Sequence, residues 1–211
     1  MPNKGYGCFA IKDLKRGTRI LTDSPLLIVP IAHYLKSDVE EAAKKLSASE
    51  RALYFSLASA HGQDKRKWPS RVHESVRGRE LQRITEQHEA RVSQSPSLVS
   101  IFQTNCMEMN NGAAVFPHAA RFNHSCNPNA NFTWNAAIGK ETVHVINDVM
   151  AGDEITFSYC DMAKEKTLRA WELKHYGFVC DCRACSEDED DLETFAHQSA
   201  ERRYVSPNHN H

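Results

Sequence analysis

The first thirty residues show the pattern of short β-strands. Apolar and β-branched side chains fill residues 18–23 and 26–29, and Ser24-Pro25 separates these two runs. A glycine-rich opening precedes them. Short runs that are bounded by turn-forming residues are typical of strands, so we predict that residues 1–30 form β structure.

The pattern changes to helical spacing over residues 31–95. A first helix is predicted from apolar positions three or four residues apart, which are Val39, Ala42, Ala43 and Leu46. Ser47 and Glu50 have the spacing of a capping box, so they predict the start of a second helix. We expect His61-Gly62 to end that helix, because glycine favours the left-handed conformation found at helix C-termini.

β-strand patterns return after Ser97. Three further strands are predicted, over residues 130–134, 143–146 and 155–159. A turn at 137–140 joins the first two, and a helix is expected over 164–175, before a cysteine-rich segment. Together with the first thirty residues, these strands predict one mainly β domain, of the α+β class, that a helical insert interrupts.

Residues 11–20 and 146–155 resemble each other. Both segments carry Ile, Asp, Gly and Ile at the same four relative positions. This spacing predicts a strand, a turn that ends at glycine, and a second strand in both places. Chance or generic turn chemistry is an equally good explanation of so short a match.

Composition and charge exclude some classes of function. The 211 residues carry a net charge of −1, so bulk electrostatics attracts neither nucleic acid nor an anionic membrane. The longest apolar run, residues 26–31, is too short to span a bilayer, and the N-terminus has no signal-peptide pattern. We therefore expect an intracellular protein, in the nucleus or the cytoplasm, without membrane or direct nucleic-acid contacts.

Its seven cysteines favour a metal site or reactive thiols over disulfides.

Two charged segments have simple explanations. The insert is locally basic around Lys65-Arg66-Lys67, but acidic residues are interspersed there. A solvated surface is therefore favoured over a contact with nucleic acid or an acidic partner. Residues 187–191 are all acidic and predict a solvated, partly disordered tail.

Four consecutive polar side chains occupy positions 123–126, between Phe122 and the turn former Pro128. They offer an amide, an imidazole, a hydroxyl and a thiol. A core strand would not choose four such groups in a row, because each needs a hydrogen-bond partner once it is buried. A surface loop would not need the flanking Phe122 and Phe132. We interpret residues 121–134 as the lining of a site.

Three cysteines lie within six residues, at Cys180, Cys182 and Cys185. So short a segment can place three sulfur ligands around one ion, and zinc favours tetrahedral sulfur coordination. A closed structural site needs a fourth ligand, and the sequence leaves several candidates open. They are Cys8, Cys106, Cys126 and Cys160.

Four blocks of this sequence resemble the SET-domain lysine methyltransferases, and they occur in that family's order. The blocks are Gly5-Tyr6-Gly7, residues 121–126, residues 152–159 and the Cys-x-Cys-x-x-Cys segment at 180–185. The insert and the Tyr-Gly-Phe sequence before the cysteines look closest to the SMYD-like and fungal SET-only branch. The chain departs from full SMYD proteins by lacking their MYND zinc finger and C-terminal helical repeat domain, so inherited substrates and partners do not carry over.

The resemblance implies a fold of small β-sheets with a knot-like crossing and a zinc-bound post-SET tail. It divides the chain into an N-terminal SET part (1–30), a helical insert (31–100), a C-terminal SET part (101–160), a post-SET zinc segment (161–186) and an acidic tail (187–211). Cys126 would complete the zinc site with the three tail cysteines. S-adenosylmethionine would be held by Lys4, Gly5, Tyr6, Gly7, Asn105, Asn123, His124, Tyr176 and Phe178.

The resemblance also implies methyl transfer to a lysine of a protein substrate, histone or non-histone. Free lysine has a pKa of ~10.4, and an apolar aromatic channel beside a cation would favour its reactive neutral form. Tyr159 would orient the amine, and Tyr176 and Phe178 would form the channel wall. Two alternatives stay open: a binding module without turnover, which intact Tyr159 and Asn123 argue against, and a SET scaffold that acts on small molecules.

Overall fold

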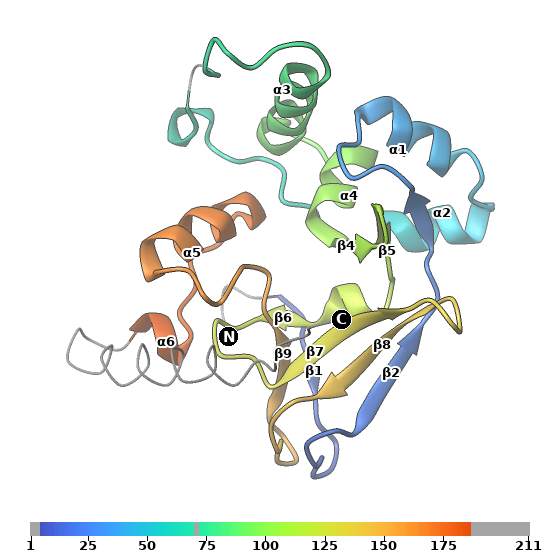
Figure 1. Ribbon diagram of the computed structural model, residues 1–211, viewed down its shortest axis with the longest axis vertical. Coiled ribbons are helices and arrows are strands. Elements are labelled where there is room, and N and C mark those ends of the chain that lie inside the picture. Colours follow the sequence, from blue (N-terminus) through green and yellow to red (C-terminus); the bar gives the residue numbers. More distant parts are fainter. Residues whose placement is uncertain (1–4, 70–71, 187–211) are drawn as a thin grey trace, which may run out of the picture.

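The computed structural model describes residues 5–69 and 72–186, and the chain forms three small β-sheets with helices gathered above and beside them (Figure 1). Two predicted features lie outside the described residues. They are Lys4 and the acidic tail, 187–211. No helix in the described ranges is both long enough and apolar enough to cross a membrane.

Each sheet has three strands. One has the order β1 (Cys8–Phe9), β9 (Glu154–Phe157), β6 (Asn123–His124). Another has the order β2 (Arg19–Asp23), β8 (Lys140–Val145), β7 (Ala130–Asn135). The last has the order β3 (Leu27–Val29), β5 (Gly112–Val115), β4 (Cys106–Met109). Neighbouring strands are antiparallel, except that β6 and β9 run parallel.

Helices fill the stretch between β3 and β4, as the spacing predicts. They are α1 (Lys36–Ala43), α2 (Ala48–Phe55), the 3-10 helix η1 (Lys65–Lys67), α3 (Gly78–Val92) and α4 (Leu98–Asn105). The predicted capping box is confirmed, since Glu50 N donates to Ser47 Oγ over 3.3 Å and Ser47 N donates to the Glu50 carboxylate over 2.8 Å. The remaining helices are η2 (Ala119–Arg121), α5 (Lys166–Leu173), η3 (Lys174–Tyr176) and α6 (Arg183–Ser186).

The second predicted helix is shorter than expected, because α2 ends at Phe55 and not at His61-Gly62. The chain leaves the helix where α4 offers other hydrogen-bond partners. Asn105 Nδ2 donates to the Ala58 carbonyl over 2.7 Å, and Ala60 N donates to Thr104 Oγ1 over 3.0 Å. These tertiary bonds satisfy backbone groups that further helical turns would otherwise satisfy.

The helical insert also continues further than predicted. Residues 98–105 form α4, although β structure was expected from Ser97 onward, and this helix crosses the predicted boundary at residue 100. Ser97 caps the helix, since its hydroxyl accepts from Ser100 N over 3.1 Å. The sequence prediction also missed the β4–β5 hairpin, in which a Cβ at Gly112 would lie 2.3 Å from the Val29 carbonyl oxygen. Glycine is required at that close approach.

The described part of the chain has two large hydrophobic cores, besides a small cluster around Cys126, Leu173 and Ala184. One lies among the sheets and includes Phe116, Val143 and Phe157. The other packs the insert against the β3–β5–β4 sheet and includes Tyr54 and Phe102. Each core buries side chains from both halves of the interrupted β domain, so the insert is anchored to the sheets rather than appended to them.

The two segments that resemble each other, 11–20 and 146–155, lie side by side. Leu14 and Val149, which occupy the same relative position, form an antiparallel β-bridge. Their backbone groups exchange two hydrogen bonds, of 2.8 and 2.9 Å. The pair therefore has an approximate local two-fold arrangement. The predicted turn and the strand after it are confirmed in both segments, whereas the predicted first strand is reduced to the single bridge between Leu14 and Val149.

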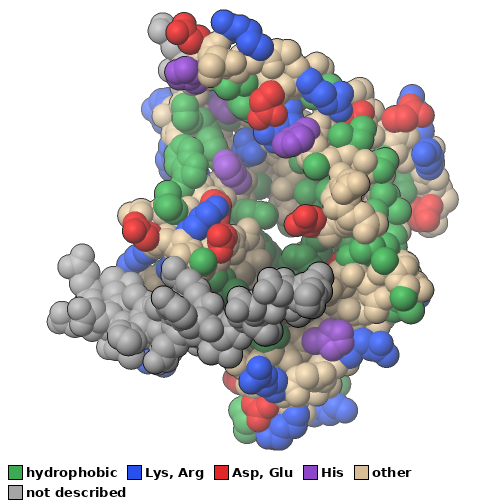
Figure 2. Space-filling model, viewed as in Figure 1, with side chains coloured by type: hydrophobic (Ala, Val, Ile, Leu, Met, Phe, Trp, Pro, Cys, Tyr) green, Lys and Arg blue, Asp and Glu red, His purple; other side chains and the backbone are tan. Residues whose placement is uncertain are grey.

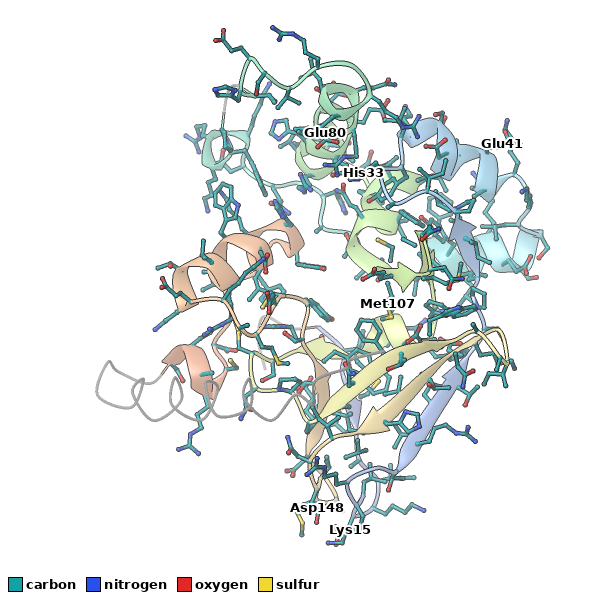
Figure 3. The ribbon with its side chains drawn as sticks, in the orientation of Figure 1. Lys15, His33, Glu41, Glu80, Met107 and Asp148 are labelled. Carbon is teal, nitrogen blue, oxygen red and sulfur yellow. The ribbon has the colours of Figure 1, made fainter. Side chains whose placement is uncertain are left out.

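The aspartate of each segment caps the turn of the other. Asp148 Oδ1 accepts from Arg16 N over 2.9 Å, and Asp13 Oδ1 accepts from Ala151 N over 2.9 Å. Lys15 and Asp148, at the tip of this pair in Figure 3, also form an ion pair of 2.8 Å. These reciprocal bonds give the sequence match a physical reason.

Candidate active site and metal centre

A cavity of about 530 Å³ opens where the N-terminal segment, the insert and the segment after α5 meet. Every residue predicted to contact a cofactor that lies in the described part of the chain lines this cavity, as does Tyr159. These residues are Gly5, Tyr6, Gly7, Asn105, Asn123, His124, Tyr176 and Phe178. A concave site of this size, with a few convergent polar groups, is typical of small-molecule binding.

One side of this cavity is built from three residues that contact one another: Gly7, Asn123 and Glu154. Asn123 Nδ2 donates to Glu154 Oε1 over 2.7 Å and to the Tyr6 carbonyl over 3.3 Å. A Cβ at Gly7 would lie 2.3 Å from Glu154 Oε1 and 2.8 Å from Asn123 Nδ2. Glycine therefore lets the N-terminal backbone approach the β6–β9 pair closely.

Asn105 brings the insert into the cavity. Its Nδ2 donates to the carbonyls of Ala58 and Ile101, both over 2.7 Å, and the residue is buried. Both amide hydrogens are thereby used inside the protein, so the side-chain oxygen is the group left to meet a ligand. Ala58 lines the same cavity, which places the extended segment after α2 in the site.

A second, narrower cavity of about 180 Å³ meets the first, and Asn105, Tyr159 and Tyr176 line both. The other walls are mainly apolar and aromatic. They include Cys106, Met107, Phe122, Phe132 and Phe157, and Glu108 is the one acidic residue among them. Figure 2 shows the molecule hollowed between the insert and the sheets, and Met107 lies at this junction in Figure 3. The two cavities together form a wide site with a narrow aromatic extension.

Tyr159 stands where the two cavities meet. Its hydroxyl donates to the carbonyl of Phe122, and its ring lies 4.8 Å from that of Tyr176 between centroids. Burial raises the pKa of Tyr159 above its ordinary value and that of Tyr176 to about 12. Both hydroxyls are therefore neutral at physiological pH, and the Tyr159 oxygen keeps lone pairs that can accept a hydrogen bond.

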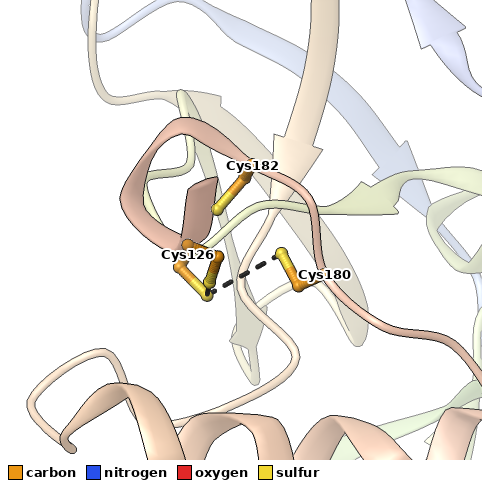
Figure 4. Close-up of side chains that lie close together, drawn as sticks. Cys126, Cys180 and Cys182 are labelled. Atoms are coloured by element: carbon orange, nitrogen blue, oxygen red, sulfur yellow. Dashed lines mark hydrogen bonds between the residues drawn. The ribbon is translucent and has the colours of Figure 1, made fainter. Parts of the chain in front are cut away.

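Four cysteines gather beside this site, as shown in Figure 4. Cys126 follows β6, and Cys180, Cys182 and Cys185 belong to the segment around α6. Their sulfur atoms all lie within 4.8 Å of one another, and none of them forms a disulfide. The sequence left the fourth ligand among several candidates, and the geometry brings Cys126 to the three tail cysteines.

The donor set of this cluster fits a zinc ion. A zinc–sulfur distance of about 2.3 Å in a tetrahedron requires sulfur atoms about 3.8 Å apart. Cys126 Sγ lies 3.5 Å from Cys185 Sγ and 4.0 Å from Cys180 Sγ. Hydrogen bonds to Cys160, Cys180 and Cys182, together with burial, raise the pKa of the Cys126 thiol, whereas hydrogen bonds to Cys126 and Cys180 lower the pKa of Cys182. A divalent cation would take the place of the shared protons.

Arg169 supplies positive charge next to the cluster. It is buried on α5, where its guanidinium donates to the Lys164 carbonyl over 2.6 Å. Burial lowers the pKa of Arg169, but hydrogen bonds and charge interactions with Cys126 and Cys185 raise it by more. A zinc ion with four thiolates carries a net charge of −2, so this cation would offset part of it.

His124 connects the cysteine cluster to Tyr159. The Tyr159 backbone N–H donates to His124 Nδ1, and His124 Nε2 lies 3.2 Å from Cys126 Sγ. Its imidazole is therefore engaged with other protein groups, and any contact with a cofactor falls to the rest of the residue. A second group of sulfur and nitrogen atoms consists of His124, Cys126 and Cys160.

A family model of the SET domain matches residues 5–160. The chain belongs to the SET domain family. This match spans the sheets, the insert, the N-terminal wall of the wide cavity and Tyr159, and it ends before the tail cysteines. The predicted resemblance is therefore confirmed, and the fold is that of a SET domain with small sheets and several helices.

Individual relatives agree with this assignment. Histone-lysine N-methyltransferase set5 of Schizosaccharomyces pombe is 29% identical over 193 residues, which cover 90% of this chain and 50% of that protein. The SET domain-containing protein L678 of Acanthamoeba polyphaga mimivirus is 28% identical over 86% of this chain and 74% of its own length. N-lysine methyltransferase SMYD2-B of Xenopus laevis is 38% identical over 38% of this chain and 18% of its own length. The chain thus spans about half the length of set5.

Several residues of the SET-domain cavities were not predicted. Ser56, Leu57 and Ala58 come from the extended segment after α2, and Thr104 comes from α4. Small and apolar side chains such as these carry no chemical signal in a sequence. Glu154 did carry one, because it is an acidic residue within the 152–159 block that proved to bond with Asn123.

Proposed function

We propose that the protein transfers a methyl group from S-adenosylmethionine to a lysine side chain of a protein substrate. The observation that carries this proposal is the meeting of two cavities at Tyr159 and Tyr176: one has the size and polar groups for a cofactor, and the other is narrow and aromatic. Such an arrangement lets two reactants enter from different openings and meet at one point. The names of set5 and SMYD2-B, both lysine methyltransferases, support it.

The wide cavity would hold S-adenosylmethionine. Asn123 donates both amide hydrogens to Glu154 and Tyr6, so like Asn105 it offers its side-chain oxygen to the polar amino-acid part of the cofactor. The backbone of Gly5 to Gly7 and the ring of Phe178 provide close, mainly apolar walls. When it is bound there, the cofactor supplies an electrophilic methyl group on a sulfonium.

The narrow cavity would hold the lysine side chain. Burial among Phe122, Phe132 and Phe157 disfavours the ammonium form, so the neutral amine that can attack carbon is favoured. The Tyr159 hydroxyl donates to the Phe122 carbonyl, and its oxygen can accept an N–H of the amine. This leaves the amine lone pair free to face the wide cavity. The protein thus contributes position and desolvation rather than a nucleophile.

Zinc would be held by Cys126, Cys180, Cys182 and Cys185. The ion would tie the tail to Cys126, two residues after the end of β6, and so order the tail together with the cofactor cavity. On this proposal residues 161–186 act as a post-SET zinc segment, with 1–30 and 101–160 as the two SET parts around the insert at 31–100. The knot-like crossing and the acidic tail at 187–211 stay predictions.

The substrate class is an accessible protein lysine, histone or non-histone, inside the cell. The test is incubation of the purified chain with cell extract and isotopically labelled S-adenosylmethionine, followed by mass spectrometry of labelled residues. We expect the label on lysine side chains. Binding of cofactor without labelled protein would favour a binding module, and label only in the small-molecule fraction would favour a SET scaffold that acts on small molecules.

A further inference from the structure

One aromatic residue of the insert contacts the segment after α5. Trp68 directly follows η1 and is only 9% exposed. Its ring stacks on that of His175, with centroids 5.1 Å apart and an interplanar angle of 9°. His175 immediately precedes Tyr176, which lines both cavities.

Cations strengthen this contact. Lys174 Nζ lies 4.5 Å from the centroid of the Trp68 ring and also donates to the Lys67 carbonyl. The Arg91 guanidinium carbon lies 5.1 Å from the Trp68 ring. Cation–π contacts of desolvated groups are among the stronger non-covalent interactions of an aromatic side chain. Trp68 is therefore fixed by residues of the insert and of η3 at once.

Gln63 of the insert also contacts the residues around Tyr176. Gln63 Nε2 donates to the His175 carbonyl and to the Ala60 carbonyl, both over 3.1 Å. Gly177 ends η3 in the left-handed conformation, with φ 79°, and a Cβ there would lie 3.3 Å from Gln63 Nε2. The insert thus contacts the residues immediately before and after Tyr176.

The segment 177–180 is not closely packed on the side that faces the insert and α5. A cavity of about 510 Å³ lies next to Gly177, Phe178 and Cys180, on the insert and α5 side, and Trp68 lines it too. Gly177 and Phe178 also line the wide cavity, so this short segment separates two open spaces. Phe178 packs on the other side, against the rings of His124 and Tyr159. Because the side that faces the insert is open, the contacts of the insert with this segment lie at its beginning, at His175 and Gly177.

We propose that Trp68 is a positioning residue for the cofactor cavity. It holds His175, and through it Tyr176 and Phe178, in the place where they close the site. The proposed zinc ligation at Cys180 would hold the other end of the same segment. Loss of the Trp68 contact should therefore leave zinc binding unchanged. This inference rests on the proposed function, because it assigns the wide cavity to S-adenosylmethionine.

The experiment compares S-adenosylmethionine binding by calorimetry in the wild type, Trp68→Ala and the conservative Trp68→Phe. Trp171→Ala is the comparison variant, since Trp171 contacts the same Lys174 at 4.7 Å but lies on α5 and is 48% exposed. Its ring meets those of Trp68 and His175 only at a tilted or edge-on angle, with centroids 6.3 and 6.4 Å away, and does not stack on His175. We expect at least tenfold weaker binding in Trp68→Ala, with zinc content unchanged. Trp68→Phe and Trp171→Ala should stay within about threefold of the wild type, because each keeps an aromatic ring on His175.

Unchanged cofactor affinity in folded Trp68→Ala would overturn the inference, as would equal weakening in Trp171→Ala. If Trp68→Ala does not fold by circular dichroism, Gln63→Ala decides, since it removes a single side chain at the same junction. We then expect several-fold weaker binding, and wild-type affinity would overturn the inference. A wild type that does not bind S-adenosylmethionine would instead refute the proposed function, which separates the two failures.

Discussion

The backbone N–H of Tyr159 donates a hydrogen bond of 3.0 Å to Nδ1 of His124. Because Nδ1 accepts this bond, the ring proton of a neutral imidazole resides on Nε2. Nε2 faces Cys126 Sγ at 3.2 Å, so His124 can donate to that sulfur. One imidazole thus connects the backbone of the proposed catalytic tyrosine to a proposed zinc ligand.

Replacement of His124 should therefore weaken zinc binding. Groups that hydrogen-bond to metal ligands typically contribute 10- to 100-fold to metal affinity, and we expect a loss of about that size in His124→Ala. The measurement is competition for zinc with a chromophoric chelator. His33→Ala is the control, since His33 is an exposed residue of the insert. Equal zinc affinity in the two variants would show that the His124 contact has no role at the metal.

The zinc site itself can be tested by elemental analysis. We expect one zinc per chain in the wild type and marked loss in Cys182→Ser, because three thiolates cannot close a tetrahedral structural site. Cys160→Ser is the control: Cys160 lies near Cys126 but outside the four-cysteine group. Full zinc retention in both Cys126→Ser and Cys182→Ser would refute the assignment, and zinc loss in Cys160→Ser would move the site to the second group.

Cofactor affinity should depend on Asn123. Asn123→Ala removes the side-chain oxygen that we propose to accept a hydrogen bond from the cofactor, together with the amide nitrogen that positions it on Glu154. Loss of such a hydrogen bond costs roughly 1–3 kcal/mol, or about 5- to 150-fold in affinity for S-adenosylmethionine. Calorimetry on the folded variant measures this change. Wild-type affinity would mean that the chain does not use this amide in its cofactor cavity.

Glu141 gives the fold a pH dependence that is separate from the site. It is fully buried on β8, and within the described residues no hydrogen bond reaches its carboxylate oxygens. Burial and the nearby Asp23 raise the pKa of Glu141 from 4.5 to about 7. Between these values the folded chain keeps a proton that the unfolded chain has lost, so this group lowers stability as the pH rises through the window.

Glu141→Gln should therefore stabilise the protein relative to the wild type as the pH rises from 5 to 8. We expect the difference in unfolding free energy to grow by about 1 kcal/mol per pH unit up to about pH 7, the pKa of Glu141 in the folded chain, and to level off above it, measured by denaturant unfolding. Glu108→Gln is the control, since Glu108 is exposed on β4. A difference between Glu141→Gln and wild type that does not change with pH would contradict the shifted pKa.

The sequence predicted those elements whose signal is local. The capping box at Ser47 and Glu50 fixes the start of α2, and the aspartates at 13 and 148 cap each other's turns. The end of α2 was mispredicted, because hydrogen bonds between residues more than forty positions apart decide it. Patterns in a short window cannot contain such partners. Helix α4 was missed although its cap, Ser97 to Ser100, is local.

The candidate site shows the same difference between local sequence signals and long-range contacts. Residues in short motifs, such as Asn123 and Tyr159, line one cavity in the structure, and their roles there stay predictions. The fourth cysteine could not be chosen by spacing, because Cys126 is more than fifty residues from Cys180 and only the fold brings them together. Trp68 was missed for a similar reason, since its partner His175 lies far along the chain.

The most direct test of the account is the rate of methyl transfer by Tyr159→Phe. Tyr54→Phe is the matched control, because the Tyr54 hydroxyl also donates to a backbone carbonyl, that of Leu98 over 2.7 Å, but lies in the insert core. We predict that the wild type and Tyr54→Phe methylate a protein lysine at similar rates. Tyr159→Phe should be on the order of a hundredfold slower, with zinc content and cofactor affinity preserved. Undiminished methyl transfer in Tyr159→Phe would contradict the account.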